Sequence, residues 1–412
     1  MSERLLLILP TTTYRASAFM QAARRLAIQV VVASERRQAL AAATPGKTLA
    51  IDFFDPDRAV DQIVGFAGDW PLRAVLGVDD YTVVLAALAS QALSLPHNPP
   101  ESVRAAANKH LMRRLLRDTG IPSPAFALLS LDDDPRRLGC AVPFPCVLKP
   151  VFLAASRGVI RADDPEQFTA AFERIAALLA APELVRRGGP AARQLLAEEY
   201  IPGAEVALEG LLRGGELAVL ALFDKPDPLE GPFFAETLYI TPSRLPPDLQ
   251  EHIRARTEEA TRALGLREGP IHAELRLNDA GIWVVEIAAR SIGGLCSRIL
   301  RFGVDISLEE LILRHAVGWP LEELEREGTA AGVMMLPVPR KGVLSQVRGV
   351  EAARRVLGVE EVVITIPREQ KVEPLPEGDR YLGFIFARGP SPAQVEEALR
   401  RAGDRIEVVI VP

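Results

Sequence analysis

Short apolar runs and amphipathic segments alternate along the first 95 residues of the chain. The runs have the length of buried strands, and the segments between them show the spacing of helices that bury one face. This alternation predicts a parallel sheet with helices on both faces, a Rossmann-like unit. The runs span residues 5–9, 29–34 and 74–78, and the helical segments lie near 16–27, 56–67 and 81–93. The turn after the first run reads PTTTYR and not GxGxxG, so we expect no dinucleotide site there.

A proline-rich break, LPHNPPESV at 95–103, ends this pattern and predicts that a second unit begins near residue 98. Asn108 is placed to cap a helix that ends at Gly120. After this helix, the sequence predicts a strand, a loop, a strand and a helix over 144–181, and mainly strands from 194. Three further helices are predicted: one near 248–265, one opened by a capping box of Ser307 and Glu310, and a last one with Pro392 in its first turn. We therefore predict four units, with bounds 1–97, 98–195, 196–322 and 323–412, the last being a small α+β appendage that follows an acidic linker, LEELEREG at 321–328.

Charge and cysteine content narrow the class of protein. The 54 acidic residues exceed the 48 basic ones, so no chain-wide positive field exists to hold nucleic acid or an anionic membrane. Three cysteines without CxxC spacing fit a reducing cytoplasm. The first apolar run is too short for a signal segment, and no stretch reaches the roughly 18 apolar residues of a membrane helix. We expect a cytoplasmic protein without nucleic-acid or membrane partners, and a homodimer from base rates.

The segment IHAELRLNDAGIWVVEIAAR (271–290) predicts a hairpin that gathers polar side chains on one face. Asn278 and Gly281 occupy the first and fourth positions of a type I turn, which predicts a three-residue loop that pairs Asn278 with Ile282, and a Gly281 in the αL conformation. In this register Glu274 lies opposite Glu286. Arg276 then faces Val284, and His272 faces Ala288. The other face is apolar throughout, with Ile271, Ala273, Leu275, Leu277, Trp283, Val285 and Ile287.

Two glutamates directly across a ladder repel each other unless a cation lies near them. Paired carboxylates without a cysteine suit a hard divalent ion such as Mg²⁺ or Mn²⁺. The alternative is that Arg276 and Arg290 neutralise Glu274 and Glu286 on a solvated face. The hairpin by itself does not decide between the two.

Lysine is rare in this chain, since only six of the 48 basic residues are lysine and the other 42 are arginine. Lys149 ends a buried strand, VLKP, and Ser156 and Gly158 follow it, a set that can bind a polyphosphate through an ammonium, a hydroxyl and backbone N–H groups. Lys109 lies in the first turn of its helix, where a cation opposes the helix dipole unless an anion is near. The plainer interpretation of both is a solvated strand end and an exposed helix residue.

Together, these features resemble the ATP-grasp superfamily over roughly residues 1–320. The motifs occur in the order of that family: a Rossmann-like unit, NKHLMR (108–113), VLKP (147–150) with a small-residue loop, LLAEEYIPGAEVALEG (195–210), and glutamates in HAELRL and VVEIAAR. FDKPDPLEGPFFAETLYITPSRL (223–245) and RYLGFIFARG (380–389) resemble the branch of bacterial L-amino-acid ligases and carnosine synthase. The resemblance implies that units 98–195 and 196–322 are the two α+β subdomains that clasp ATP.

The resemblance also implies a role for individual residues. Lys109 and Lys149 would contact ATP phosphates, with Ser156 in the lid loop (residues 151–158). Glu274 and Glu286 would hold Mg²⁺, and Arg290 would stabilise the transferring phosphoryl group. The remaining expected contacts are Glu198, Glu199, Tyr200 and Ile201 at the adenine edge, Glu205 at the ribose, and Gly293 and Gly294 at the substrate carboxylate.

Two positions depart from the family pattern. The lid loop has Leu153, Ala154 and Ala155 where many members have glycines, which predicts a stiffer loop with less room for phosphates. Ala288 stands where the family often has an asparagine, so one potential metal ligand is missing and the second-ion site is in question.

The implied activity is an ATP- and Mg²⁺-dependent carboxylate–amine ligase that proceeds through an acyl phosphate, with L-amino acids joined to a dipeptide as the favoured reaction. For His272 we expect either substrate contact and help in amine deprotonation or a structural role, and for Glu236 the binding of a substrate ammonium. The alternatives are a purine-biosynthesis or biotin-carboxylase-like ATP-grasp enzyme, and a non-catalytic ATP-binding sensor, which Ala288 and the glycine-poor lid loop favour.

Overall fold

The computed structural model describes residues 4–36, 46–321 and 324–412. Residues 1–3, and residues 322 and 323 of the acidic linker, lie outside these ranges. The predicted boundary between 322 and 323 therefore also lies outside them. In the described part of the chain, no helix is long and apolar enough to cross a membrane.

The N-terminal unit is the predicted Rossmann-like sheet, with parallel strands in the order β3-β2-β1-β4. Both faces of its central strand are buried: Leu5 and Leu7 pack toward Phe19, and Leu6 and Ile8 toward Ile63. Burial on both faces explains why these strands are continuous apolar runs. The elements are β1 (Arg4–Ile8), α1 (Ala16–Arg25), β2 (Gln29–Ser34), β3 (Thr48–Ala50), which was not predicted, α2 (Pro56–Asp69), β4 (Ala74–Gly77) and α3 (Asp80–Ala92).

The second unit begins with two helices. Residues 95–103 were predicted to be a break, but Pro100 opens helix α4 (Pro100–Ala107), because proline is well tolerated in a first helical turn. Helix α5 (Lys109–Asp118) begins at Asn108 as predicted, and the Asn108 side chain accepts hydrogen bonds from two backbone N–H groups. An antiparallel sheet follows in the order β5-β8-β6-β7. Its elements are β5 (Phe126–Ser130), α6 (Pro135–Gly139), β6 (Cys146–Pro150), β7 (Ile160–Ala162), α7 (Pro165–Leu179), α8 (Pro182–Gly188) and β8 (Gln194–Glu199). Of the three cysteines, Cys140 in this unit is exposed, whereas Cys146 and Cys296 are buried.

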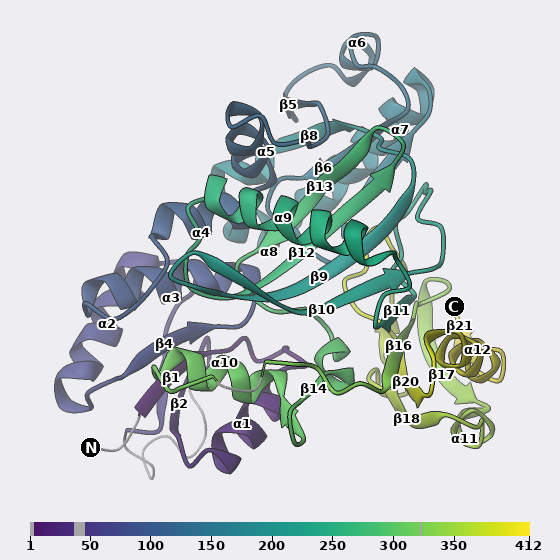
Figure 1. The fold of residues 1–412 in the computed structure, drawn as a ribbon. Coiled ribbons are helices and arrows are strands. Elements are labelled where there is room, and N and C mark those ends of the chain that lie inside the picture. Colours follow the sequence, from purple (N-terminus) through teal and green to yellow (C-terminus); the bar gives the residue numbers. More distant parts are fainter. Residues whose placement is uncertain (1–3, 37–45, 322–323) are drawn as a thin grey trace.

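An eight-stranded sheet of order β13-β12-β9-β10-β11-β16-β20-β18 crosses the centre of the molecule (Figure 1). Its first five strands come from residues 204–288 and its last three from the C-terminal segment, joined where β11 pairs with β16. The C-terminal strands therefore continue the sheet that carries the predicted site. The strands are β9 (Ala204–Arg213), β10 (Glu216–Lys225), β11 (Leu238–Thr241), β12 (Gly269–Asn278), β13 (Gly281–Ala288), β16 (Ala330–Leu336), β18 (Val359–Ile364) and β20 (Gly383–Gly389).

The helix α10 (Leu308–Ala316) begins with the predicted capping box of Ser307 and Glu310. It packs against α1 of the N-terminal unit, as Figure 1 also shows. The remaining elements are α9 (Pro247–Ala263), β14 (Arg301–Phe302), β15 (Ile306–Ser307), β17 (Gly342–Arg348), α11 (Val350–Arg354), β19 (Lys371–Val372), α12 (Pro392–Gly403) and β21 (Glu407–Val411).

The hairpin β12–β13 has the predicted partners at the site but not at its turn. Asn278 pairs with Gly281 and not with Ile282, so the loop has two residues and the predicted three-residue loop is wrong. Gly281 has φ of +136°, outside the αL region predicted for it. A bulge between the pairs Leu275–Val284 and Glu274–Glu286 adds one residue to β13 and restores the predicted register beyond it.

The bulge changes which residues face the core. Arg276 lies opposite Trp283 and not Val284. Val284 is fully buried in the core, and Val285, predicted to be apolar core, lines the cavity described below. The freed backbone groups are used elsewhere, since the Val284 N–H donates to the Pro122 carbonyl and the Val285 carbonyl accepts from Arg113.

Candidate active site

A cavity of about 290 Å³ lies where the N-terminal unit, the second unit and the eight-stranded sheet meet. All fifteen residues predicted as site residues line it, although they come from distant parts of the sequence. These are Lys109, Lys149, Ser156, Glu198, Glu199, Tyr200, Ile201, Glu205, Glu236, His272, Glu274, Glu286, Arg290, Gly293 and Gly294.

A second, larger cavity of about 460 Å³ lies between α3, α10 and the start of β12. Only Arg290 lines both cavities. The larger one holds none of the other predicted site residues, and apolar side chains form most of its wall, including Val83, Ile312 and Trp319. Convergence of charged groups is the better indicator of chemistry, so the smaller cavity is the candidate active site.

Glu274 and Glu286 lie directly opposite each other on β12 and β13, as predicted. The two arginines that could have neutralised them bind other carboxylates: Arg276 binds Glu205, and Arg290 binds Asp80. The nearest ammonium to Glu286 is Lys109, 3.5 Å from Nζ to Oε2. The alternative in which Arg276 and Arg290 form the ion pairs with Glu274 and Glu286 is therefore wrong.

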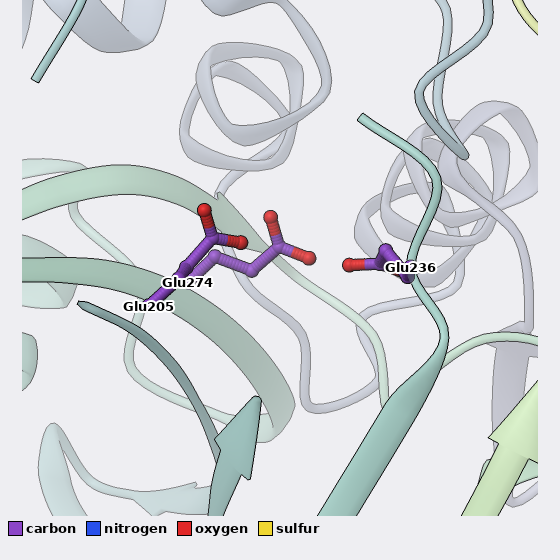
Figure 2. Close-up of side chains that lie close together, drawn as sticks. All are labelled: Glu205, Glu236 and Glu274. Atoms are coloured by element: carbon purple, nitrogen blue, oxygen red, sulfur yellow. The ribbon is translucent and has the colours of Figure 1, made fainter. Parts of the chain in front are cut away.

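Glu205, Glu236 and Glu274 form a second acidic cluster, in which one oxygen from each lies within 4.8 Å of the others (Figure 2). The Lys225 ammonium lies among them, hydrogen-bonded to Glu205 and Glu236 and 3.9 Å from Glu274. Burial disfavours this ammonium, but Glu205 and Glu236 outweigh it and raise the Lys225 pKa well above its ordinary value.

The two acidic groups differ as metal sites. The cluster around Lys225 already has its cation, because the ammonium bonds two of its three carboxylates. Glu274 and Glu286 are neighbours on adjacent strands in one wall of the cavity. Both are partly exposed, with side-chain exposures of 20% and 26%. Two accessible carboxylates fit a hard divalent ion that keeps some of its own water, as Mg²⁺ does.

Lys149 and Glu198 form a buried ionic group with Arg113. The Lys149 Nζ lies 2.6 Å from Glu198 Oε2, and the Arg113 Nε lies 2.8 Å from Glu198 Oε1. Burial raises the carboxyl pKa of Glu198, but Arg113 and then Lys149 outweigh this and lower it below its ordinary value. Glu198 is therefore ionised, and its two oxygens hold the two cations in place.

Lys109 lines the same cavity as Lys149. Its ammonium donates to the Leu153 carbonyl at 2.6 Å and is buried to 8% exposure. The exposed-residue interpretation of Lys109 and Lys149 is thus wrong, since α5 and β6 direct both ammonium groups into the interior. In the lid loop, Ala155 and Ser156 both have φ of 56°, a conformation that suits glycine better.

His272 forms an ion pair with a glutamate that was not predicted. Its Nδ1 lies 3.2 Å from Glu209 Oε2, and its Nε2 lies 3.7 Å from Glu274 Oε1. Burial disfavours the charged ring, but hydrogen bonds to Glu209 and Glu274 outweigh it and raise the His272 pKa to about 9. Burial also raises the pKa of Glu209. We assign Glu209 as the anion, because its Oε2 already accepts hydrogen bonds from His272 and from the Ile292 N–H.

Arg290 is held by the N-terminal unit. Its Nε and Nη2 donate to the two oxygens of Asp80, each at 2.9 Å, and Asp80 opens helix α3. Burial opposes the charge on Asp80, but Arg290 outweighs it and lowers the Asp80 pKa. A bidentate pair of this kind fixes the plane of the guanidinium as well as its position.

The segment Glu198–Ile201 also forms part of the cavity wall. The Tyr200 ring lies between two guanidinium groups, with Arg161 at 4.1 Å and Arg276 at 5.1 Å from its centroid. Arg276 also donates to the Ile201 carbonyl at 2.7 Å and to Glu205 at 2.8 Å. This part of the wall therefore offers an aromatic ring, an ionised carboxylate and backbone groups side by side.

Glu236, which lies beside Glu205 in the acidic cluster, accepts hydrogen bonds from Lys225 and from the Tyr239 hydroxyl, both at 2.6 Å. Burial, and after it Glu274, raise the Glu236 pKa, and Lys225 opposes them. Gly293 leaves open space, because a Cβ built there meets no atom within 4 Å. Ala288 is buried opposite His272, as the predicted register requires.

Sequence reasoning missed several residues that hold the site together: Asp80, Arg113, Glu209 and the ion-pairing role of Lys225. A signal existed for Asp80, since Asp79 and Asp80 lie two and three residues after the end of strand β4, where ligand sites of parallel sheets gather. Arg113 and Glu209 have partners 85 and 63 residues away, and no local pattern indicates them.

Models of known domain families match three parts of the chain. The ATP-grasp N-terminal domain matches residues 20–97, the ATP-grasp domain matches 142–299, and the L-amino acid ligase C-terminal domain 2 matches 334–411. The matches include the strands that carry Lys149, Glu205, Glu274 and Glu286.

The chain is similar over its whole length to the crystal structure of an L-amino acid ligase from Bacillus licheniformis. The TM-score is 0.83 at 26% identity, covering 100% of this chain and 99% of that one. It is 28% identical to an alanine–anticapsin ligase of Bacillus subtilis over 66% of this chain and 60% of that protein. It is 32% identical to carnosine synthase 1 of Homo sapiens over 62% of this chain and 32% of that protein. The alignments thus span less than two thirds of the length of these two relatives.

Proposed function

Since this chain is an ATP-grasp protein with an L-amino acid ligase C-terminal domain, we propose that it is an ATP-dependent ligase that activates a carboxylate and joins it to an amine. The observation that carries the proposal is that Lys109, Lys149, the opposed pair Glu274–Glu286 and Arg290 all line one cavity.

ATP would occupy the length of this cavity. The backbone of residues 199–201 and the Tyr200 ring would hold the adenine, and Glu205 would hold the ribose. Lys109 and Lys149 would contact the phosphates from the two sides, with Ser156 at the terminal phosphate. The Glu198 carboxylate already binds two cations, so its role in the proposal is to position Lys149 and not to accept from the adenine.

Glu274 and Glu286 would hold Mg²⁺ or Mn²⁺, which when bound neutralises phosphate charge during phosphoryl transfer. Arg290, fixed by Asp80, would stabilise the charge that develops as the carboxylate attacks the terminal phosphate. The open backbone at Gly293 and Gly294 would bind the substrate carboxylate. The carboxylate displaces ADP from the terminal phosphate and becomes an acyl phosphate. The amine nitrogen then attacks the carbonyl carbon, the bond to the phosphate oxygen breaks, and amide, inorganic phosphate and a proton are released.

One residue, Glu236, supports the proposal that the substrates are amino acids. Glu236, held between Lys225 and Tyr239, is a carboxylate that lines the cavity and suits an α-ammonium group. With a pKa of about 9, His272 is an imidazolium at neutral pH and cannot take a proton from the amine. We assign His272 to holding Glu274 in place, and propose that L-amino acids are joined to give a dipeptide.

The direct test is a panel of carboxylate and amine pairs incubated with the protein, ATP and Mg²⁺, with ADP, phosphate and amide measured together. The proposal predicts that ADP and amide form in equal amounts only when both substrates are present. ADP release that needs bicarbonate or a purine precursor would instead support the purine-biosynthesis or biotin-carboxylase-like alternative. Absence of amide from every pair would reject the ligase proposal.

Glu286→Gln separates a ligase from a non-catalytic sensor. Loss of one carboxylate from the metal pair should lower turnover at least about 100-fold, because metal and phosphate contacts supply most of the catalysis. Glu216→Gln, an exposed position on β10, is the matched control and should keep full turnover. ATP binding without turnover in the unmodified protein would favour the sensor.

A further inference from the structure

The lid loop contacts one short C-terminal segment, residues 376–379. The Gly158 N–H donates to the Pro376 carbonyl at 2.8 Å, and the Arg157 Nε donates to the Glu377 carbonyl at 2.9 Å. Arg157 also pairs with Asp379 at 3.3 Å. These contacts join residues 220 positions apart in the sequence.

The side chain of Glu377 adds a further connection. Its two oxygens accept from the Nε and Nη2 of Arg174 at 2.5 and 2.9 Å, a bidentate pair with helix α7. Helix α7 packs against the sheet that carries the lid loop. Segment 376–379 is therefore attached both to the lid loop and to the body of its unit.

Both sides of this contact border the candidate active site. Ala154, Ala155 and Ser156 of the lid loop line the cavity, and Asp379 and Tyr381 line it from the C-terminal side. The contact thus joins two segments of the cavity wall beside Ser156, where the terminal phosphate and the acyl phosphate are proposed to lie.

The closed lid loop needs support from outside itself. Ala155 and Ser156 have positive φ, which costs a residue with a Cβ about 1 kcal/mol or more in an isolated chain. Such conformations persist where neighbouring contacts hold them, and the bonds to Pro376, Glu377 and Asp379 are contacts of this kind.

We propose that residues 376–379 are the catch that holds the lid loop closed over the reacting groups, with Glu377 as a positioning residue that keeps water from the acyl phosphate. This inference rests on the proposed ligase function. If the catch fails, water attacks the carbonyl carbon of the acyl phosphate and the bond to the phosphate oxygen breaks. Carboxylate, inorganic phosphate and a proton are released, and the net reaction is hydrolysis of ATP.

The chemistry of the catch suits a lid that opens in every cycle. The side chains of Arg174 and Glu377 are 45% and 26% exposed to solvent, so water can replace the ion pair at little cost in free energy. A catch made of exposed ion pairs weakens as salt rises, unlike the buried Lys149–Glu198 pair.

Glu377→Gln in the full chain tests the catch. The ratio of ADP to amide should rise at least about threefold over that of the unmodified protein, because water enters the loosened site. Hydrogen exchange of residues 152–160 should become faster. Glu373→Gln is the matched control, since Glu373 lies three residues before this segment and pairs with Lys341, and should change neither measurement. Arg174→Met, which removes the pair from the other side, should reproduce the effect of Glu377→Gln.

A raised ratio together with faster exchange supports the proposal. An unchanged ratio, or unchanged exchange, in both Glu377→Gln and Arg174→Met overturns it. If the unmodified protein forms no amide with any substrate pair, the ligase proposal fails separately, and the exchange measurement alone then decides whether residues 376–379 hold the lid loop.

Discussion

Glu198 shows how one buried carboxylate serves both stability and function. It is 1% exposed and pairs with Lys149, which points into the cavity, and with Arg113, which is fully buried. A buried charge whose partner is removed costs far more than the pair contributes, so the three residues depend on one another.

We expect Glu198→Gln to lower the free energy of unfolding by about 3 kcal/mol, because it leaves Lys149 and Arg113 without a counter-charge. Glu199→Gln, at the neighbouring exposed position, should change it by less than about 0.5 kcal/mol. Urea denaturation measures both. Equal effects of the two variants would contradict the role assigned to Glu198.

The pair His272–Glu209 predicts a dependence of stability on pH in the ligand-free protein. The folded-state pKa of His272 is about 9, above its ordinary value of 6.5, so the folded state binds the proton more tightly. The resulting stabilisation is complete below pH 6.5 and is lost as the pH rises to 9. We expect a decline of about 2–3 kcal/mol across this window. His272→Asn should remove the decline and His252→Asn, at an exposed position, should not, as denaturant titrations at several pH values would show.

The residues of the site could be predicted where a local pattern indicates them. The alternation of side chains along two strands is enough to place Glu274 opposite Glu286. The pair Arg290–Asp80 could not be found in this way, since its members lie 210 positions apart and meet only when the N-terminal unit packs against the sheet.

In the hairpin β12–β13, two local differences from the prediction leave the predicted pairing of Glu274 with Glu286 intact. The turn has one residue fewer than its sequence indicates, and a bulge adds one residue to β13 before Glu286. Neither feature has a clear sequence signal, because Asn-Asp-Ala-Gly suits more than one loop. Helix α4 was missed for a similar reason, since Pro100 marks the start of a helix as readily as a break.

Gly203, between β8 and β9, is the element-scale position most open to test. It has φ of +120°, and a Cβ there would lie 2.1 Å from the Leu277 carbonyl oxygen. Gly214 also has positive φ but has open space around it. Both substitutions to alanine pay the conformational penalty of about 1 kcal/mol, and only Gly203→Ala adds a backbone clash. We expect Gly203→Ala to destabilise the protein by at least about 2 kcal/mol more than Gly214→Ala in thermal or urea unfolding.

Across the whole molecule, the eight-stranded sheet makes the C-terminal segment part of the site. Met335 and Tyr381 line the cavity from this segment, and β16 covers the edge of β11. The sequence predicts the strands of this segment but not their partners, because pairing between distant strands leaves no periodic signal in either one.

A chain that ends at residue 321 should therefore not fold into a soluble, ATP-binding protein. Removal of β16 would expose the backbone edge of β11 together with Leu238 and Ile240, which are now buried. Unpaired apolar edges associate with one another. Light scattering and ATP titration measure the outcome, and a monodisperse fragment that binds ATP as the full chain does would show that the C-terminal segment is dispensable.

The distribution of thiols allows one fluorescent label to be attached to this protein without a change in its sequence. Cys140 is exposed and belongs to the unit that carries the lid loop, whereas Cys146 and Cys296 are buried. A thiol-reactive dye would therefore attach at one place on the unmodified chain. Energy transfer from that dye to a fluorescent nucleotide would report the distance between the lid-bearing unit and the nucleotide, and so would test whether the proposed lid opens.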